Sequence, residues 1–552
     1  MTAPVANGGR ETWASRLGVI LAVTGSAVGL GNFLRFPGLA AKYDGGAFMI
    51  PYFVALLLLG LPIAWVEWAM GRYGGARGYN SSPGIYRTIW QHRAAPYAGV
   101  LAMIIPVMIY MYYVYIEAWC LAYACRYLFG KMTFEGAEGY GEFFAQFVGI
   151  PGDGGALSTP GEGLLGSAVF FLAVCFVANF VLIYRGLTKG IEWFCKWAMP
   201  ALLLCALIVL VRVLTLGTPD PDKPDQNVLN GLGFMWNPTT ERMAAEGKSF
   251  WTSLANPDMW LDAAGQIFFS LSVGFGIIVT YASYLRKDDD IALSSLTSCA
   301  GNEFCEVALG GLITIPAAFI FLGTAFIQEL QSKEFSSFGL GFVTLPNVFN
   351  RMILGQFVGF LFFFLLFLAA ITSSLSMLQP AIALLEEGLG LKRKASVAVL
   401  GFITAVGAAF VVYFSKDLTA LDTLDFWVGT FALYVLATFQ VILFGWVLGI
   451  DRGFGELNRG AEIRIPAIFK FIIKYVAPLY LLTVFGFWCY KQFIAGTGDP
   501  NEQTRLQQIG SNLTVRLAIG FILVVAVLFA LLIAQSVKRW RSAEQQQMEV
   551  SL

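Results

Sequence analysis

Long apolar stretches recur along the whole chain, separated by short polar breaks. Twelve of them reach roughly 20 residues, the length that crosses a bilayer as a helix when tilt is allowed for. The pattern therefore predicts an all-α polytopic membrane protein with twelve transmembrane helices. The predicted spans are 13–40, 46–71, 97–128, 164–184, 191–216, 258–285, 291–324, 353–387, 396–414, 420–449, 467–490 and 514–537.

Two of these runs are interrupted by paired glycines, Gly29 and Gly31 in the first run and Gly274 and Gly276 in the sixth. Glycine costs about 1 kcal/mol relative to alanine inside a helix, so each pair favours a break. Backbone groups freed at membrane depth must line a polar cavity or meet a ligand. The alternative is that the glycines only let neighbouring helices pack closely.

The positions of these two runs favour the break. They lie five crossings apart and so run through the membrane in opposite directions, as an inverted repeat of five plus five helices requires. The predicted division is a cytoplasmic segment 1–12, a first repeat 13–216, an extracellular loop 217–257, a second repeat 258–449, helices 11 and 12 within 450–537, and a cytoplasmic tail 538–552.

Charge and composition set the orientation and exclude other classes of protein. Lys and Arg collect in the even-numbered loops, which predicts that both termini are cytoplasmic. Short tails and the lack of a large glycosylated outer loop favour a bacterial inner membrane, although Asn512-Leu-Thr514 fits a glycosylation pattern. The 36 basic and 36 acidic residues cancel, which argues against a nucleic-acid partner. Eight cysteines in apolar runs and one histidine, His92, give neither a disulfide framework nor a metal site or catalytic group, so neither an enzyme nor an organic cofactor is expected.

Four ionisable residues lie at membrane depth, where their cost marks them as functional candidates: Arg35, Glu67, Glu117 and Glu306. Arg35 needs a carboxylate partner, and Asp425 has a suitable depth. For Glu67 and Glu117 the favoured interpretation is structural, namely that each carboxylate caps freed N–H groups of a broken helix.

A run of three hydroxyls, Thr372 to Ser374, interrupts an apolar helix. Such hydroxyls commonly bond back to a carbonyl of their own helix. Alternatively, the oxygens of Thr372 and Ser373 join freed carbonyls of the first run around a hard cation such as sodium. Asn32 and Asn302 carry amide oxygens of the same kind. After the seventh run, the stretch from Phe326 to Arg351 is expected to fold back over the outer mouth.

Several long motifs resemble a known family. They are Arg10-Glu-Thr-Trp13, Ala27-Val-Gly-Leu-Gly-Asn-Phe-Leu-Arg-Phe-Pro37, Gly45-Gly-Ala-Phe-Met-Ile-Pro51, Glu67-Trp-Ala-Met-Gly-Arg-Tyr73, Tyr112-Tyr-Val-Tyr-Ile-Glu117, Gln266-Ile-Phe-Phe-Ser-Leu-Ser272 and Thr372-Ser-Ser374. With them, nearly the whole chain resembles the neurotransmitter:sodium symporters, in their bacterial amino-acid branch. The resemblance implies a LeuT-type inverted repeat with broken helices 1 and 6.

The resemblance also implies two sodium ions as coupling ions. The first site would use the Ala27 carbonyl, Asn32, Ser270, Asn302 and the carboxylate of the substrate. The second would use the carbonyls of Gly25, Val28 and Ala369 and the hydroxyls of Thr372 and Ser373.

The implied substrate is a small neutral amino acid, held at the break of the first helix. The backbone at Ala27, Leu30 and Gly31 would bind it, the amides of Leu30 and Gly31 meeting its carboxylate. Tyr113 would donate its hydroxyl to the same group. The lining implied for the substrate comprises Ile109, Tyr113, Phe269, Ser270, Ser272, Phe275, Ser373 and Met377, which favours a hydrophobic or small side chain.

Gates and charge compensation complete the implied transporter. Tyr113 and Phe275 would form an outer lid, Arg35 and Asp425 an outer ion pair, and Arg10 and Glu387 an inner pair helped by Ser283 or Tyr284. Glu306 would replace the chloride ion of other relatives, so transport is expected to be chloride-independent.

The leading hypothesis is thus sodium-coupled import of a neutral amino acid by alternating access. A nontransporting amino-acid sensor with the same fold, or a symporter for another small zwitterion, is the alternative. Membrane lipid is an expected partner, and a homodimer is left open.

Overall fold

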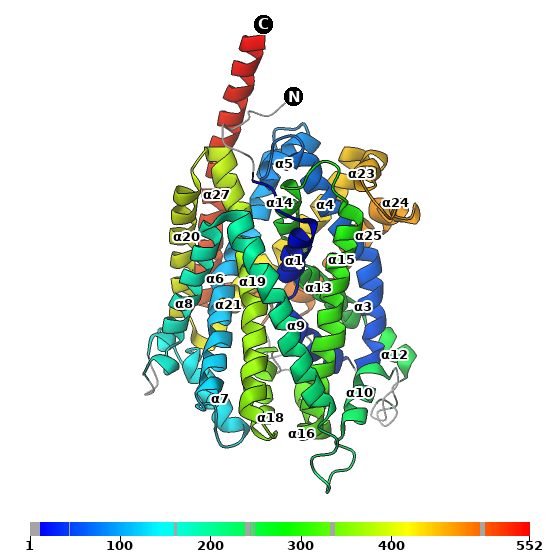
Figure 1. Cartoon of the computed structure of the whole chain (residues 1–552), viewed down its shortest axis with the longest axis vertical. Coiled ribbons are helices and arrows are strands. Elements are labelled where there is room, and N and C mark those ends of the chain that lie inside the picture. Colours follow the sequence, from blue (N-terminus) through cyan, green and yellow to red (C-terminus); the bar gives the residue numbers. More distant parts are fainter. Residues whose placement is uncertain are drawn as a thin grey trace.

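The structure is a computed structural model and describes residues 11–43, 45–158, 163–237, 249–331, 337–496 and 503–551, with the single positions 243 and 247. All regular elements within these residues are helical. Long helices run side by side along the length of the molecule (Figure 1). The last helix, α27, ends at the end of the bundle where α5 and α23 lie, and α1 begins toward the same end (Figure 1).

The predicted spans correspond to helices. Over the described residues, nine helices are long and apolar enough to cross a membrane, or ten when the bent pair Arg16–Ala27 and Gly31–Lys42 counts as one. The fourth predicted span is the apolar helix Ala168–Tyr184, which is shorter, and the sixth is divided into Pro257–Leu271 and Ile277–Ser283. Adding these two gives the twelve predicted spans.

The first five spans and their loops contain both α-helical and short 3-10 or π-helical segments. Span 1 is α1 (Arg16–Ala27), η1 (Gly31–Arg35) and α2 (Phe36–Lys42); span 2 is η2 (Gly45–Ala47), α3 (Met49–Ala55), η3 (Leu56–Gly60) and α4 (Leu61–Gly75); then follow α5 (Ser82–Ile89), α6 (Ala95–Leu128), α7 (Gly136–Phe147), η4 (Gly155–Leu157), η5 (Gly163–Gly166), α8 (Ala168–Tyr184), η6 (Leu187–Glu192) and α9 (Trp193–Leu214).

Spans 6 to 9 follow two short loop helices. The elements are α10 (Val228–Trp236), α12 (Phe250–Leu254), α13 (Pro257–Leu271), α14 (Ile277–Ser283), α15 (Ile291–Glu303), η7 (Phe304–Gly311), α16 (Leu312–Gln331), α17 (Ser337–Gly339), η8 (Leu340–Thr344), α18 (Leu345–Asn350), α19 (Gly355–Leu389) and α20 (Arg393–Tyr413).

The last three spans are the most segmented. They comprise η9 (Lys416–Leu418), α21 (Thr419–Leu424), η10 (Asp425–Ala432), α22 (Leu433–Ile442), η11 (Leu443–Gly449), α23 (Ile450–Leu457), α24 (Ile468–Phe471), η12 (Ile472–Val476), α25 (Ala477–Tyr490), η13 (Lys491–Ala495), α26 (Arg505–Ser511) and α27 (Leu513–Ser551).

The first span breaks where the glycine pattern predicts. Helix α1 ends at Ala27, Val28 is extended with φ −70° and ψ 106°, and the helix resumes at Gly31 with a bend of 50°. The break leaves the carbonyls of the last turn of α1 without the helical amides that would otherwise bond them. These carbonyls face α19, which packs along α6 and against α1.

The sixth span breaks between Leu271 and Ile277. Ser272, Gly274 and Gly276 have φ values of +53°, +80° and +77°, a region that favours glycine. A Cβ atom added to Gly276 would lie 2.8 Å from the Cβ of Ala102 on α6, so the backbone of this break approaches α6 closely.

We therefore expect Gly276→Ala to destabilise the protein by about 1–3 kcal/mol, because it combines a left-handed φ with a steric overlap. Thermal unfolding in detergent measures this as a lower midpoint. Gly486→Ala is the matched control, since Gly486 lies on an exposed face of α25 with nothing within 4 Å of the added Cβ. An equal loss in both variants would contradict the expectation.

The described part of the stretch predicted to fold back, residues 337–350, forms α17, η8 and α18. It packs on α6 through aromatic rings, with 5.7 Å between the centroids of Trp119 and Phe342. The Tyr123 hydroxyl donates to the Phe342 carbonyl at 3.1 Å. All eight cysteines are free thiols, as the sequence predicts.

Candidate functional site

Oxygen atoms from the break in α1 converge on one hydroxyl of α19. The Ser373 Oγ lies 3.4 Å from the Gly25 carbonyl oxygen, 3.2 Å from that of Ser26, 3.4 Å from that of Val28 and 3.0 Å from that of Ala369. One hydroxyl can donate to only one of these carbonyls at a time. The cluster therefore holds more acceptors than donors, which suits a cation.

Thr372 lies at the edge of this cluster. Its Oγ1 is 3.0 Å from the carbonyl oxygen of Ala369 and 3.0 Å from that of Leu368 on the same helix. The back-bonded geometry that the sequence left as an alternative is thus present, and the same oxygen remains beside the Ala369 carbonyl. The structure brings together all five residues predicted for the second ion site: Gly25, Val28, Ala369, Thr372 and Ser373.

A second cluster lies on the other side of the break and centres on Glu306 in η7. Its carboxylate accepts from the side-chain amides of Asn32 at 3.2 Å and Gln266 at 2.6 Å, and from the hydroxyl of Ser270. The side chain of Asn302 contacts both Ser270 and Asn32, at 2.6 and 2.9 Å. All five side chains are buried, so the carboxylate lies at the centre of a closed polar cluster.

The orientation of the Asn302 amide tests whether this cluster suits a cation. One terminal atom of the amide lies 3.3 Å from the Ala27 carbonyl oxygen and 3.1 Å from that of Ser270. A nitrogen at that position donates to both carbonyls, whereas an oxygen there faces two further oxygens and needs a cation among them. The structure thus brings together Ala27, Asn32, Ser270 and Asn302, the residues predicted for the first ion site, and the Asn302 amide bonds the two carbonyls when its nitrogen faces them.

These two clusters are built from carbonyl, hydroxyl and amide oxygens. Over the described residues, no group of three histidine, cysteine, aspartate or glutamate side chains could hold a metal. Oxygen donors without imidazole or thiolate suit a hard cation rather than a transition metal.

The hydroxyl of Tyr113 lies over the break, between the two clusters. The amide of Leu30 points at it from 3.5 Å, and a Cβ on Gly29 would lie 3.0 Å from the same oxygen and 3.4 Å from the Ser373 Oγ. The Gly29 amide donates to Asn32 Oδ1 at 2.8 Å. Backbone N–H groups and a phenol thus meet at one place, where a carboxylate could accept from both.

The residues predicted to line the substrate site are largely buried. Ile109, Phe275 and Met377 are buried, and the rings of Phe269 and Phe275 meet edge to face with their centroids 6.0 Å apart. Ser272 shows a contact that the sequence could not reveal, because its hydroxyl donates to the Ser26 carbonyl at 2.9 Å. The two broken spans are thereby joined directly.

The outer ion pair predicted between Arg35 and Asp425 is not formed in this structure. The guanidinium of Arg35 lies over the ring of Phe269, 4.4 Å from its centroid, and Asp425 accepts from the Tyr112 hydroxyl at 2.6 Å. Each charge therefore contacts an aromatic side chain, partly buried Phe269 or buried Tyr112, in place of the predicted ion pair.

On the opposite side, Arg10 lies outside the described residues. Glu387 accepts from the Ser81 amide at 2.8 Å, next to the start of α5, and Tyr284 accepts from Gln379 at 3.0 Å. A contact not foreseen is that of Trp13, whose indole donates to the Tyr281 carbonyl of α14 at 2.9 Å. The described beginning of the chain is thus anchored to the inner half of the sixth span.

Neither carboxylate predicted to cap a broken helix forms such a cap. Glu67 is fully buried, and neither of its carboxylate oxygens has a hydrogen-bond partner within the described residues. The prediction for Glu117 was wrong, because its carboxylate accepts from Ser374 at 2.6 Å and Asn179 at 3.1 Å rather than from freed amides. It holds α19 against α8, directly behind the hydroxyls of Thr372 and Ser373.

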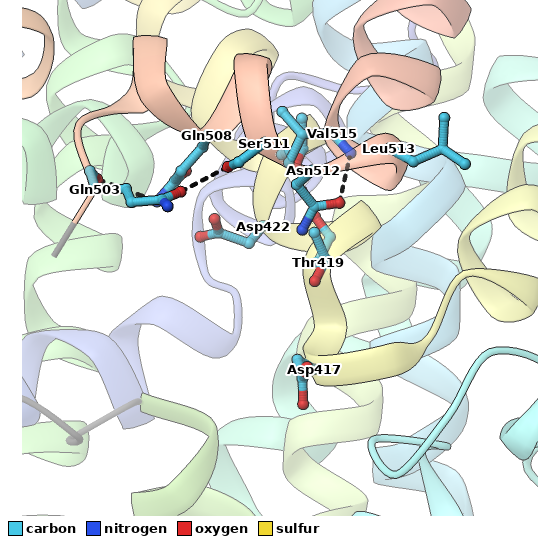
Figure 2. A pocket seen from close by; sticks show the side chains of 10 residues that line it. Asp417, Thr419, Asp422, Gln503, Gln508, Ser511, Asn512, Leu513 and Val515 are labelled. Carbon is cyan, nitrogen blue, oxygen red and sulfur yellow. Dashed lines mark hydrogen bonds between the residues drawn. The ribbon is translucent and has the colours of Figure 1, made fainter. Parts of the chain in front are cut away.

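A separate polar cleft of about 590 Å³ lies between α21, α26 and the start of α27 (Figure 2). Asp422, Gln508 and Asn512 line it, so the Asn512-Leu-Thr514 sequence falls at its edge. None of its lining residues belongs to the predicted site, and Asp422 is paired with Arg505 at 2.6 Å.

Comparisons with known proteins agree with this geometry. A profile described as "Sodium:neurotransmitter symporter family" matches residues 10–138 and 158–536. An uncharacterized sodium-dependent transporter of Methanocaldococcus jannaschii is 30% identical over 478 residues, covering 86% of this chain and 89% of the relative. The mouse sodium-dependent neutral amino acid transporter B(0)AT1 is 24% identical, covering 90% of this chain and 85% of the relative.

Among solved structures, the chain is similar to the crystal structure of MhsT in complex with L-phenylalanine, with a TM-score of 0.71 and 28% identity. The likeness covers 86% of this chain and 99% of MhsT. The fold is accordingly the LeuT-type helical fold that the sequence predicts. The chain belongs to the sodium:neurotransmitter symporter family, whose members are sodium-dependent transporters and not enzymes.

Proposed function

We propose that this protein imports a neutral, hydrophobic amino acid together with two sodium ions, by alternating access and without chloride. The observation that carries the proposal is the pair of oxygen clusters on the two sides of the break in α1. The protein would lie in the cell inner membrane as a multi-pass protein with both termini cytoplasmic.

Each cluster would bind one sodium ion. The ion at Ala27, Asn32, Ser270 and Asn302 would also meet the carboxylate of the substrate, which the Leu30 and Gly31 amides and Tyr113 would hold. Because ion and substrate share a contact, each raises the affinity of the other by the same factor. This reciprocity couples the sodium gradient to uptake.

Chloride independence is supported by the contacts of Glu306. Its carboxylate supplies a buried negative charge to the same cluster that would hold the first ion. Adding an anion beside this carboxylate would place two like charges together at low dielectric, which is unfavourable. Replacement of chloride by gluconate should therefore leave uptake unchanged.

The substrate class follows from the lining of the site. Ile109, Phe269, Phe275 and Met377 offer apolar surface, and the one nearby cation, Arg35, lies against Phe269. A charged side chain in this lining would lack a counter-charge and would lose its hydration. L-phenylalanine bound to MhsT and the neutral amino acids named for B(0)AT1 fit the same class.

Movement between the two access states would carry the broken spans together. The Ser272–Ser26 hydrogen bond links the break of the sixth span to that of the first, close to both ion clusters. Arg35 and Asp425 would pair outside, and Glu387 with Arg10 and Tyr284 inside, in the closed states of each gate.

Reconstituted proteoliposomes test the function directly. An inward sodium gradient should drive accumulation of a radiolabelled neutral amino acid, and collapse of the gradient by an ionophore should abolish it. Uptake that is unaffected by the sodium gradient would contradict the proposal. Sodium-dependent binding without any uptake would indicate the amino-acid sensor instead.

Met377 offers a test of the pocket. Met377→Ala removes a flexible apolar side chain from the lining, so tryptophan should compete better against labelled leucine than in the wild type. Because a single methylene group in a hydrophobic pocket is worth roughly 10- to 200-fold in discrimination, the leucine-to-tryptophan preference should change by at least tenfold. An unchanged preference would remove Met377 from the substrate pocket, and glycine competition checks that small substrates still bind.

A further inference from the structure

A second cleft lies around the start of α23, and none of its lining residues belongs to the site described above. It has a volume of about 420 Å³ and is formed where η11, α23 and η12 meet. The helix changes direction there at Gly449, whose φ of +87° separates η11 from α23. The lining residues are Gly445, Trp446, Gly449, Ile450, Asp451, Arg452 and Lys474.

The charge of this cleft is positive. Arg452 and Lys474 both line it, and over the described residues neither forms an ion pair with a carboxylate. The one acidic residue of the lining, Asp451, is already bound by Lys470 at 2.7 Å. Two cations thus line the same small space as a single carboxylate, which Lys470 already binds.

One wall of the cleft is an aromatic side chain that joins two elements. The indole of Trp446 donates to the Lys474 carbonyl at 2.8 Å, which fixes η11 against η12. Trp446 nevertheless remains 60% exposed. Exposed indoles of this kind are enriched where the hydrocarbon of a bilayer meets its headgroups.

Next to the cleft, one face of α24, η12 and α25 is apolar and exposed. Phe471, Tyr475, Leu479 and Leu482 follow one another at helical spacing, and each is between 48% and 67% exposed. This series, the apolar track, begins beside Lys474 and continues along the span. Such a surface is stable against acyl chains and costly against water.

The position of the cleft in the membrane is consistent with a headgroup. Helices α23 and α24 lie at the end of the bundle at which α27 ends, beside α5 (Figure 1). This is the end for which the sequence predicts a cytoplasmic location. Anionic lipids are concentrated in the cytoplasmic leaflet, and basic pockets between helices bind their headgroups.

We propose that this cleft binds the phosphate diester of an anionic phospholipid through Arg452 and Lys474, with an acyl chain lying along the apolar track. The combination of two unpaired cations with a continuous apolar surface selects a lipid over a soluble phosphate, which would use the cations alone. The site is independent of the transport proposal, because none of its residues lines the ion clusters or the substrate site.

Native mass spectrometry of the full-length protein tests the proposal. The protein is exposed to phosphatidylcholine mixed with phosphatidylglycerol and then released from mild detergent, and the bound lipids are counted. Wild type should retain phosphatidylglycerol over phosphatidylcholine. The double variant Arg452→Gln, Lys474→Gln should bind it roughly thirtyfold more weakly, since each cation near a membrane surface contributes roughly fivefold.

The matched control is Lys392→Gln, Lys394→Gln, which removes the same charge from exposed positions at the start of α20. It should retain phosphatidylglycerol as the wild type does; an equal loss would show a general charge effect and overturn the proposal. Leu479→Gln tests the track separately and should weaken retention while keeping both cations. Sodium-dependent amino-acid binding by every variant checks folding.

A soluble-ligand arm separates the two sources of phosphate. Inorganic phosphate and glycerophosphate, added in excess over the lipid, should leave phosphatidylglycerol bound. Displacement by either, or wild-type retention of phosphatidylcholine equal to that of phosphatidylglycerol, would overturn the assignment to an anionic lipid.

Discussion

Glu306→Gln should lower the sodium affinity of the protein roughly a hundredfold or more. The variant keeps the shape of the side chain but removes the negative charge to which Asn32, Gln266 and Ser270 are bonded. Removing one partner of a buried charge pair costs about 3–5 kcal/mol, because the other charge is left without compensation. A sodium ion bound in the adjacent cluster would lose its compensating negative charge in this variant.

The same variant should become sensitive to chloride. A small anion can supply the missing negative charge, so chloride should restore part of the uptake in Glu306→Gln, and gluconate should not. Sodium titration of substrate binding, with each anion in turn, measures both effects. Persistent chloride insensitivity together with normal sodium affinity would contradict the role proposed for this carboxylate.

Glu303→Gln is the matched control for that experiment. Glu303 lies three residues earlier on the same span, and its carboxylate accepts from the Tyr52 hydroxyl at 2.7 Å. We expect a much smaller change in sodium affinity and no chloride dependence. If both variants lost sodium affinity equally, the effect would belong to the packing of this span rather than to the charge of Glu306.

The broad architecture could be predicted from the sequence because bilayer thickness imposes a length on each span. Twelve apolar runs appeared as helices, and the paired glycines marked both breaks. The short helix α8 shows the limit of this argument, since its described helical part has 17 residues and its apolar run continues into the loop. Apolar length predicts a crossing but not where the helix itself begins.

The sequence could predict which residues belong to the site, because their side-chain chemistry suits its ligands. It could not predict which hydrogen-bond partners they have, because those depend on the fold. The resemblance assigned Ser373 and Asn302 to the ion sites, and the structure brings their side chains to the carbonyls of the breaks. The partner of Ser272 could not be foreseen, because a serine beside a break can bond to its own helix as easily as to a neighbour. Its left-handed φ of +53° turns it toward Ser26.

Charged residues were the hardest to place. Arg35 and Asp425 carry opposite charges at similar depths. In the structure, however, Arg35 contacts Phe269 and Asp425 accepts from Tyr112. Glu117 resembled a helix cap because it is a lone carboxylate in a membrane span, and only tertiary packing brings Asn179 and Ser374 to it. Sequence can show that a buried charge needs a partner, but several polar groups of the fold compete for it.

Thr372→Val should weaken sodium binding by roughly tenfold to a hundredfold, the value of one charge-assisted oxygen contact of about 1.5–3 kcal/mol. Valine keeps the branched shape of threonine and removes the oxygen beside the Ala369 carbonyl. The loss should appear in sodium titrations of substrate binding, and in uptake at low sodium, where the second ion site limits transport. Saturating sodium should restore much of the uptake.

The competing interpretation is that this hydroxyl only bonds back to its own helix. Thr404 in α20 separates the two, since its Oγ1 makes the same contacts one turn back, at 2.8 Å from the Leu400 carbonyl oxygen and 3.3 Å from that of Gly401. Both threonines are buried, so Thr404→Val removes an equivalent back-bond without touching an ion cluster. Normal sodium affinity in Thr404→Val beside a loss in Thr372→Val assigns the oxygen of Thr372 to the ion. Equal sodium affinity in the two variants would show that the Thr372 hydroxyl only bonds to the backbone of α19. Ser373 would then be the only side-chain ligand of the second cluster among those proposed.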